Sequence, residues 1–198
     1  VGYSGTGTLN ITNGGTVNTT NDSSVHVGRQ AGSVGVISVD GAGSKLTTVG
    51  NIIVGYSGTG TMNITNGGAA SNGVTGFIGR YADSIGTVNV DGANSTWTNE
   101  TNIYIGYFGN GTLNITNGGT MTDTYGRISR EAGSTGNVTV DGANSTWTNT
   151  SKDPTYNYGL HVGSTNSTGT GTLTISNGGV VNVTAAPTVL AYFSGSKG

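Results

Sequence analysis

The chain has 198 residues and a formal net charge of −2; only 8% of its residues are charged, 38 are glycine and none is cysteine. This charge balance excludes the basic stripe of a nucleic-acid-binding protein, and the lack of cysteine excludes disulfides and thiolate metal sites. No apolar run is long enough for a transmembrane helix, so we expect no membrane insertion by this segment.

The first segment, VGYSGTGTLNITNGG at Val1–Gly15, returns three times along the chain. Its copies lie at Val54–Gly68, Ile105–Gly119 and, more loosely, Val162–Gly179. A second motif alternates with it at Val27–Leu46, Ile78–Trp97 and Ile128–Trp147, with a truncated copy at Leu190–Gly198. Both motifs share one plan, so the repeating unit is about 25 residues long. An internal repeat of this length predicts a solenoid.

Each unit contains three candidate strands. The first is a short apolar strand such as Val25–Val27, and the second alternates strictly, as in Thr8–Thr12, where Leu9 and Ile11 share one face. This period of two predicts a half-buried strand. The third strand is shorter and carries one large apolar residue per unit: Val17, Leu46, Trp97, Met121, Trp147 or Val181. Nothing in the chain shows helical periodicity.

Three short strands per unit predict an all-β fold, a right-handed parallel β-helix in which each unit forms one rung. Residues 1–198 then form a single repeat domain of seven rungs plus a partial eighth. Rungs stacked at ~4.8 Å bring equivalent apolar residues into continuous interior columns. Right-handed coiling is the default for parallel crossovers. Asn-Gly and Asp-Gly pairs suit the corners, because Asn and Gly tolerate positive φ.

The sequence GTLNITNGG, followed by VxVDGANSTWTN and then IxIGYxGxGTL, resembles the repeat of type V secretion (autotransporter) passengers and PEP-CTERM-associated surface proteins. The resemblance covers nearly the whole chain. It implies a right-handed β-helix displayed outside the cell or on its surface as a stalk, adhesin or matrix component. It supplies no catalytic residues.

One position per rung alternates between tyrosine and arginine. The residues are Tyr3, Arg29, Tyr56, Arg80, Tyr107, Arg130 and Tyr192, with Ser164 between the last two. In a stack they form one column, which we interpret in two ways. The column either stabilises the rungs through cation–π contacts, or it contacts a partner by stacking on sugar rings and binding an anionic glycan.

Periodic polar residues argue against catalysis. Asp40, Asp91 and Asp141 recur every second rung, ~9.6 Å apart, close to the ~6.5–9.5 Å between the carboxyls of inverting glycosidases. A catalytic site is local, however, and an Asx turn accounts for Asp before Gly. We therefore expect no enzyme, and no cofactor. Solitary His26 and His161 face outward by parity, which predicts no metal site. An ice-binding plane is an alternative for the Thr-rich outer face, although Asp and Val interrupt its rows.

The repeat is interrupted between residues 150 and 168. The extra residues include Lys152, Asp153, Tyr156 and Tyr158, and the next bend, which contains Asn166, is longer too. Insertions in solenoids often form binding loops, so these five residues are a candidate binding site. The alternative is a tolerated surface insertion.

These patterns predict an extracellular structural or adhesive β-solenoid: a surface stalk, a passenger or a self-assembling fibre subunit. The chain starts and stops inside a repeat, so we expect it to be a segment of a longer precursor or one subunit of an assembly. Copies of itself, end to end or side by side, or flanking domains are the expected partners. The alternative function is an adhesin module that binds glycans or a host surface, and a polysaccharide-active enzyme or an ice-binding protein fits less well.

Overall fold

The computed structural model describes residues 1–21, 23–164 and 168–190, which form 21 strands in three parallel sheets and no helix. Sheet A contains β1 Thr6–Thr12, β4 Val34–Asp40, β7 Thr59–Thr65, β10 Ile85–Asp91, β13 Asn110–Thr116, β16 Thr135–Asp141 and β19 Thr170–Ser176. Sheet B contains β2 Thr16–Thr19, β5 Lys45–Thr48, β8 Ala69–Asn72, β11 Thr96–Asn99, β14 Thr120–Asp123, β17 Thr146–Asn149 and β20 Val180–Val183. Sheet C contains β3 Val25–Val27, β6 Ile52–Val54, β9 Gly76–Ile78, β12 Ile103–Ile105, β15 Gly126–Ile128, β18 Leu160–Val162 and β21 Thr188–Leu190.

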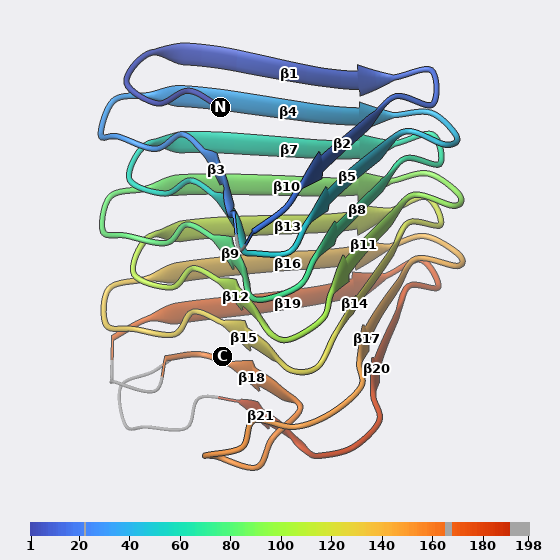
Figure 1. The fold of residues 1–198 in the computed structure, drawn as a ribbon. Coiled ribbons are helices and arrows are strands. Elements are labelled where there is room, and N and C mark those ends of the chain that lie inside the picture. The colour runs from blue at the N-terminus through green and yellow to red at the C-terminus, as the bar shows by residue number, and fades with distance from the viewer. Residues whose placement is uncertain (22, 165–167, 191–198) are drawn as a thin grey trace.

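Each rung takes one strand from each sheet, so β1 to β3 form the first rung and β19 to β21 the seventh. Figure 1 shows the strands of sheet A stacked from β1 to β19, with sheets B and C as the other two walls of a solenoid. The predicted three-stranded rung and parallel stacking are therefore confirmed. The partial eighth rung falls, after Leu190, outside the described residues.

The interior follows the predicted period of two. Leu9 pairs in register with Ile37, and the same column continues through Met62, Val88, Leu113, Val138 and Leu173. The residues of this column in the second to sixth rungs are at most 1% exposed. Burying such a side chain fully is worth roughly 1.5–3 kcal/mol. Leu9 and Leu173 are only partly buried, because within the described residues a rung covers them on one side alone.

The corners between sheets A and B depend on left-handed backbone. Asn66 and Gly67 have φ of 53° and 85°, a combination that Asn and Gly reach with little strain. A different glycine, Gly86, lies inside β10 because there is no room for a side chain. A Cβ at Gly86 would lie 2.2 Å from the carbonyl oxygen of Val54, the last residue of β6. This close approach lets the bend before each sheet A strand pack against the strand itself.

Polar side chains on the outer face of sheet A join neighbouring rungs. The amide of Asn89 donates to Asn63 at 2.7 Å, and the amide of Asn114 donates to Asn89 at 2.8 Å. Asp40 accepts hydrogen bonds from Thr65 at 2.6 Å and Asn66 at 2.7 Å. These hydrogen bonds, from Thr65 first and then Asn66, hold the pKa of Asp40 below its usual range.

Asp91 and Asp141 repeat this pattern with the Thr or Ser and the Asn of the following rung, at 2.5–2.6 Å. The Asx-turn interpretation of these aspartates therefore needs correction. Their carboxylates accept from the next rung, since that rung places a hydroxyl and an amide directly over them.

Candidate functional site

The Tyr/Arg positions follow the bends that lead from sheet C to sheet A. The structure places Tyr3, Arg29, Tyr56, Arg80, Tyr107 and Arg130 in six consecutive rungs. From the second rung on, each backbone N–H donates to a glycine carbonyl of the preceding rung at 2.9–3.1 Å. These bonds run from Arg29 to Gly2, Tyr56 to Gly28, Arg80 to Gly55, Tyr107 to Gly79 and Arg130 to Gly106. They fix one side chain per rung in a single column. Ser164 continues the column, and Tyr192 lies outside the described residues.

Guanidinium groups lie against phenol rings within this column. The Cζ atom of Arg29 is 4.7 Å from the ring centroid of Tyr3 and 5.8 Å from that of Tyr56. Arg130 lies 4.7 Å from the ring of Tyr107. Exposed contacts of this kind are worth about 0.5–1 kcal/mol each, so these distances favour the interpretation that the column stabilises the stack. These contacts leave other edges of the side chains accessible to a ligand, since 58% of Tyr3 remains exposed.

A second column lies beside the first, on the outer face of sheet C. It consists of the middle residue of each short strand: His26, Ile53, Phe77, Tyr104, Arg127 and His161. Phe77 stacks on Tyr104 with centroids 5.3 Å apart, and Tyr104 meets Tyr107 of the first column edge-on at 5.1 Å. Sequence reasoning missed Phe77 and Tyr104 as surface aromatics. The signal was available, because the middle residue of an apolar triplet faces outward by parity.

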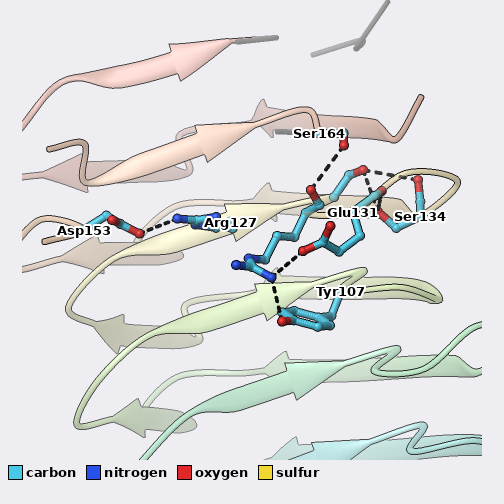
Figure 2. Close-up of polar contacts among 8 residues, drawn as sticks. Tyr107, Arg127, Glu131, Ser134, Asp153 and Ser164 are labelled. Atoms are coloured by element: carbon cyan, nitrogen blue, oxygen red, sulfur yellow. Dashed lines mark hydrogen bonds and ion pairs between the residues drawn. The ribbon is translucent and has the colours of Figure 1, made fainter. Parts of the chain in front are cut away.

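The arginines on this face differ in their charge partners. Arg130 pairs with Glu131 and donates to the hydroxyl of Tyr107 at 2.6 Å. Arg127 pairs with Asp153; Figure 2 shows this pair together with the contacts of Tyr107 and Glu131. Within residues 1–21, 23–164 and 168–190 these are the two ion pairs, so neither Arg29 nor Arg80 has a described carboxylate within 4.0 Å.

An open groove lies along the Tyr/Arg column in the first three rungs. It has a volume of about 380 Å³. Its lining residues are Tyr3, Arg29, Gln30, Ala31, Tyr56 and Ser57. Binding sites for small ligands have volumes of roughly 300–1,000 Å³, so the groove can accept about one sugar-sized group at a time.

The insertion at 150–159 folds back over sheet C instead of extending into solvent. Asp153 is 3% exposed and accepts hydrogen bonds from Arg127 and from the backbone N–H groups of Thr155 at 2.8 Å and Tyr156 at 2.9 Å. Burial opposes ionisation of Asp153, but the hydrogen bonds from Arg127, Tyr156 and Thr155 outweigh it and hold its pKa below the usual range. Asp153 is therefore a buried partner of Arg127.

Aromatic rings complete this cover. Arg127 lies 4.9 Å from the ring of Tyr156 and 5.3 Å from that of Tyr158, and Tyr158 meets His161 at 4.8 Å. Tyr158 and His161 are each 1% exposed. Of the candidate loop residues, Lys152 and Tyr156 are exposed, and Asn166 lies outside the described residues. His161 has the outward parity that the sequence predicts, but the insertion buries it.

Burial of His161 makes the last rungs sensitive to acid. Burial first, and then the charge of Arg127, lowers the pKa of His161 to about 4, although Asp153 opposes the shift. The unfolded chain gains this proton near pH 6.5. The free energy of unfolding is therefore expected to fall as the pH decreases from about 6.5 to about 4. Replacing His161→Phe should weaken that dependence, which urea unfolding at pH 4.5 and pH 7 would measure. An unchanged difference between the two pH values would contradict the assignment.

The described residues offer neither a metal-ligand cluster nor a membrane-spanning helix. Across the described ranges, no group of three or more His, Cys, Asp or Glu side chains is placed to hold a metal ion. The same ranges contain no helix that is long and apolar enough to cross a membrane.

Comparison with known proteins identifies two similar sequences. The chain is 38% identical over 104 residues to the uncharacterized lipoprotein YdeK of Escherichia coli K12. The aligned region covers 50% of this chain and 8% of that protein. It is 34% identical over 94 residues to the adhesin BmaC autotransporter of Brucella suis biovar 1, covering 46% of this chain and 3% of that protein. No family model and no solved structure matches. The chain thus spans less than a tenth of either relative, and both similarities are compatible with a surface or autotransporter-related protein.

Proposed function

We propose that this segment is a structural and adhesive spacer of a cell-surface or secreted protein, in the manner of an autotransporter passenger. The observation that carries the proposal is the unbroken stack of seven rungs, in which each rung covers the next. Such a stack extends by ~4.8 Å per rung without needing a new core. The similarity to an autotransporter adhesin and to a lipoprotein supports a place at the cell surface.

The proposal gives the segment no catalytic role. The carboxylates of Asp40, Asp91 and Asp141 recur with the repeat, and each already accepts two hydrogen bonds from the following rung. The expected association with copies of itself stays a prediction.

Surface exposure is tested with the full-length protein in its source cell. An antibody raised against residues 1–190 is expected to label intact cells, and protease added outside the cells should remove the label. Labelling that requires permeabilised cells would contradict the proposal. An antibody against a cytoplasmic protein controls for cell integrity.

Deleting whole rungs tests the role as a spacer. Removing residues 52–102 joins Asn51 to Ile103, so β3 pairs with β12, and Asp40 meets Thr116 and Asn117 as Asp91 normally does. This two-rung deletion is expected to fold with a melting temperature close to that of the parent protein and to shorten the stack by ~9.6 Å.

The matched control removes a single rung, residues 52–75, which joins Asn51 to Gly76. The strands still align, but Asp40 then lies beside Asp91 and Arg29 beside Arg80. Like charges in adjacent positions destabilise a sheet, so the control should melt at a lower temperature than the two-rung deletion. If the two-rung deletion failed to fold, or melted no higher than the single-rung control, the rungs would not be interchangeable and the proposed role as a spacer would be wrong.

A further inference from the structure

The first four rungs carry a strip of aromatic rings and guanidinium groups, which we call the Tyr3–Tyr81 strip. It comprises Tyr3, Arg29, Tyr56, Arg80 and Tyr81, and it includes the groove of about 380 Å³. The ring of Tyr56 separates the two arginines, with its centroid 5.8 Å from Arg29 and 5.4 Å from Arg80. Tyr81 lies 5.2 Å from Arg80 and 4.8 Å from the ring of Tyr56, so both rings contact the guanidinium group of Arg80 and each other. The rings therefore hold both guanidinium groups at fixed positions.

The outer rings of the strip are available to a ligand. Tyr3 is 58% exposed and Tyr81 is 39% exposed, whereas Tyr56 is half-buried between the arginines. Apolar ring area of this size at a surface is a feature of binding sites when polar groups surround it.

The strip also has unbalanced positive charge. Arg29 and Arg80 have no described carboxylate within 4.0 Å, although Arg127 and Arg130 on the same face do. The neighbouring His26 responds to this charge. Burial first, and then Arg29 and Arg80, lowers its pKa. A guanidinium group that stacks on a ring keeps its N–H edge free for bidentate binding of a carboxylate or sulfate.

We propose that the Tyr3–Tyr81 strip binds an extended acidic polysaccharide, with acidic groups paired to Arg29 and Arg80 and sugar rings stacked on Tyr3 and Tyr81. The proposal deepens the adhesive part of the function given above. Arg29 and Arg80 lie two rungs apart, ~9.6 Å, which is close to the length of a disaccharide in an extended chain. A polymer with one acid on every second sugar therefore matches the repeat.

Charge spacing favours such a polysaccharide over a nucleic acid. A DNA strand carries one phosphate per ~3.4 Å, and proteins that bind it line their grooves with correspondingly dense positive charge. The strip offers two free arginines over ~9.6 Å on a chain with net charge −2, so it matches a sparsely charged polymer.

Binding is tested with the isolated chain and defined oligosaccharides. The probe is a hyaluronan oligosaccharide, which carries one carboxylate on every second sugar, and its fully methyl-esterified form is the matched neutral control with the same rings and linkages. A thymidine oligonucleotide represents nucleic acid. Isothermal titration calorimetry at low and high salt should show binding of the hyaluronan oligosaccharide that is at least tenfold tighter than binding of either control, and that weakens as salt increases.

Two double variants separate the strip from general charge effects. Arg29→Gln with Arg80→Gln is expected to weaken binding of the hyaluronan oligosaccharide at least tenfold. Lys45→Gln with Lys152→Gln removes the same charge from exposed positions elsewhere and should bind like the parent protein. Circular dichroism and melting temperature establish that both variants fold.

Three outcomes would overturn the proposal: equal binding of the esterified probe, unchanged binding by the folded arginine variant, or tighter binding of the oligonucleotide. None of them affects the labelling of intact cells or the two-rung deletion, so the proposed spacer function would stand or fall separately.

Discussion

Replacing Asp123→Asn is expected to stabilise the protein above pH 7 and to remove a loss of stability between about pH 4 and pH 7. Asp123 ends β14 and points into the solenoid, where it is 1% exposed. Its carboxylate accepts hydrogen bonds at 2.6 Å from the indole N–H of Trp147 and from the amide of Asn149. Burial outweighs these two bonds and raises the pKa of Asp123 to about 7.

The direction of the effect follows from the proton balance. In the unfolded chain the carboxyl ionises near pH 4, while in the folded protein it stays protonated up to about pH 7. The contribution of Asp123 to stability is therefore fully present below pH 4 and is lost as the pH rises to about 7. At pH 8 the loss amounts to about 4 kcal/mol, since one pKa unit corresponds to about 1.4 kcal/mol.

Asparagine suits this position because neighbouring rungs already use it. Asn72, Asn99 and Asn149 occupy the same place at the end of their strands, and Asn72 accepts from Trp97 at 3.0 Å as Asp123 accepts from Trp147. In the Asp123→Asn variant the amide oxygen can accept from Trp147, and the new amide NH2 group can donate to Oδ1 of Asn149 once the amide of Asn149 turns over, so no charge is buried. Urea unfolding of the parent protein and the variant at pH 5 and pH 8 measures the difference.

The expected gain from Asp123→Asn is small at pH 5 and several kcal/mol at pH 8. His161 titrates equally in both proteins, so it cancels in the comparison. Asp83→Asn, at an exposed turn, controls for the change in net charge and should alter neither value by much. A variant that was less stable than the parent protein at pH 8 would contradict the assignment.

Period-two patterning allowed most of the fold to be predicted from the sequence. Leu9 and Ile11 define the buried face of their strand, and the constant unit length places Ile37 and Val39 directly beside them. The same reasoning gives the position of the Tyr/Arg column, because one residue per rung necessarily stacks. Asp123 could also have been found, since it lies two residues after buried Met121 and so shares its inward face.

Contacts outside the repeat could not be predicted in this way. The partner of Asp153 is Arg127, 26 residues earlier and on the outer face of the preceding rung. Nothing in the local sequence around Asp153 specifies whether the inserted segment extends into solvent or folds back. The segment folds back because this buries Tyr158 and gives Arg127 a charge partner. The periodic pattern predicts instead that Arg127 faces solvent.

That pairing makes Asp153→Ala the most destabilising substitution that we expect near the insertion. The variant leaves Arg127, 3% exposed, without its charge partner, and removing one member of a buried ion pair costs about 3–5 kcal/mol. The segment should then detach from sheet C and expose Tyr158 and His161. Arg127→Leu combined with Asp153→Ala removes both charges and should recover much of the loss, since apolar replacement of a buried pair is often close to neutral.

A readout at His161 separates this local effect from a general loss of stability. The pKa of His161, followed by NMR, is expected near 4 in the parent protein and to rise towards 6.5 in Asp153→Ala, because burial, the largest cause of the low pKa, depends on the closed segment, while the charge of Arg127 beside it in sheet C still opposes protonation. Lys152→Ala, which alters an exposed neighbour in the same insertion, should leave it near 4. If Asp153→Ala kept the low pKa and full stability, tyrosine packing alone would hold the segment in place, and the ion pair would have no structural role.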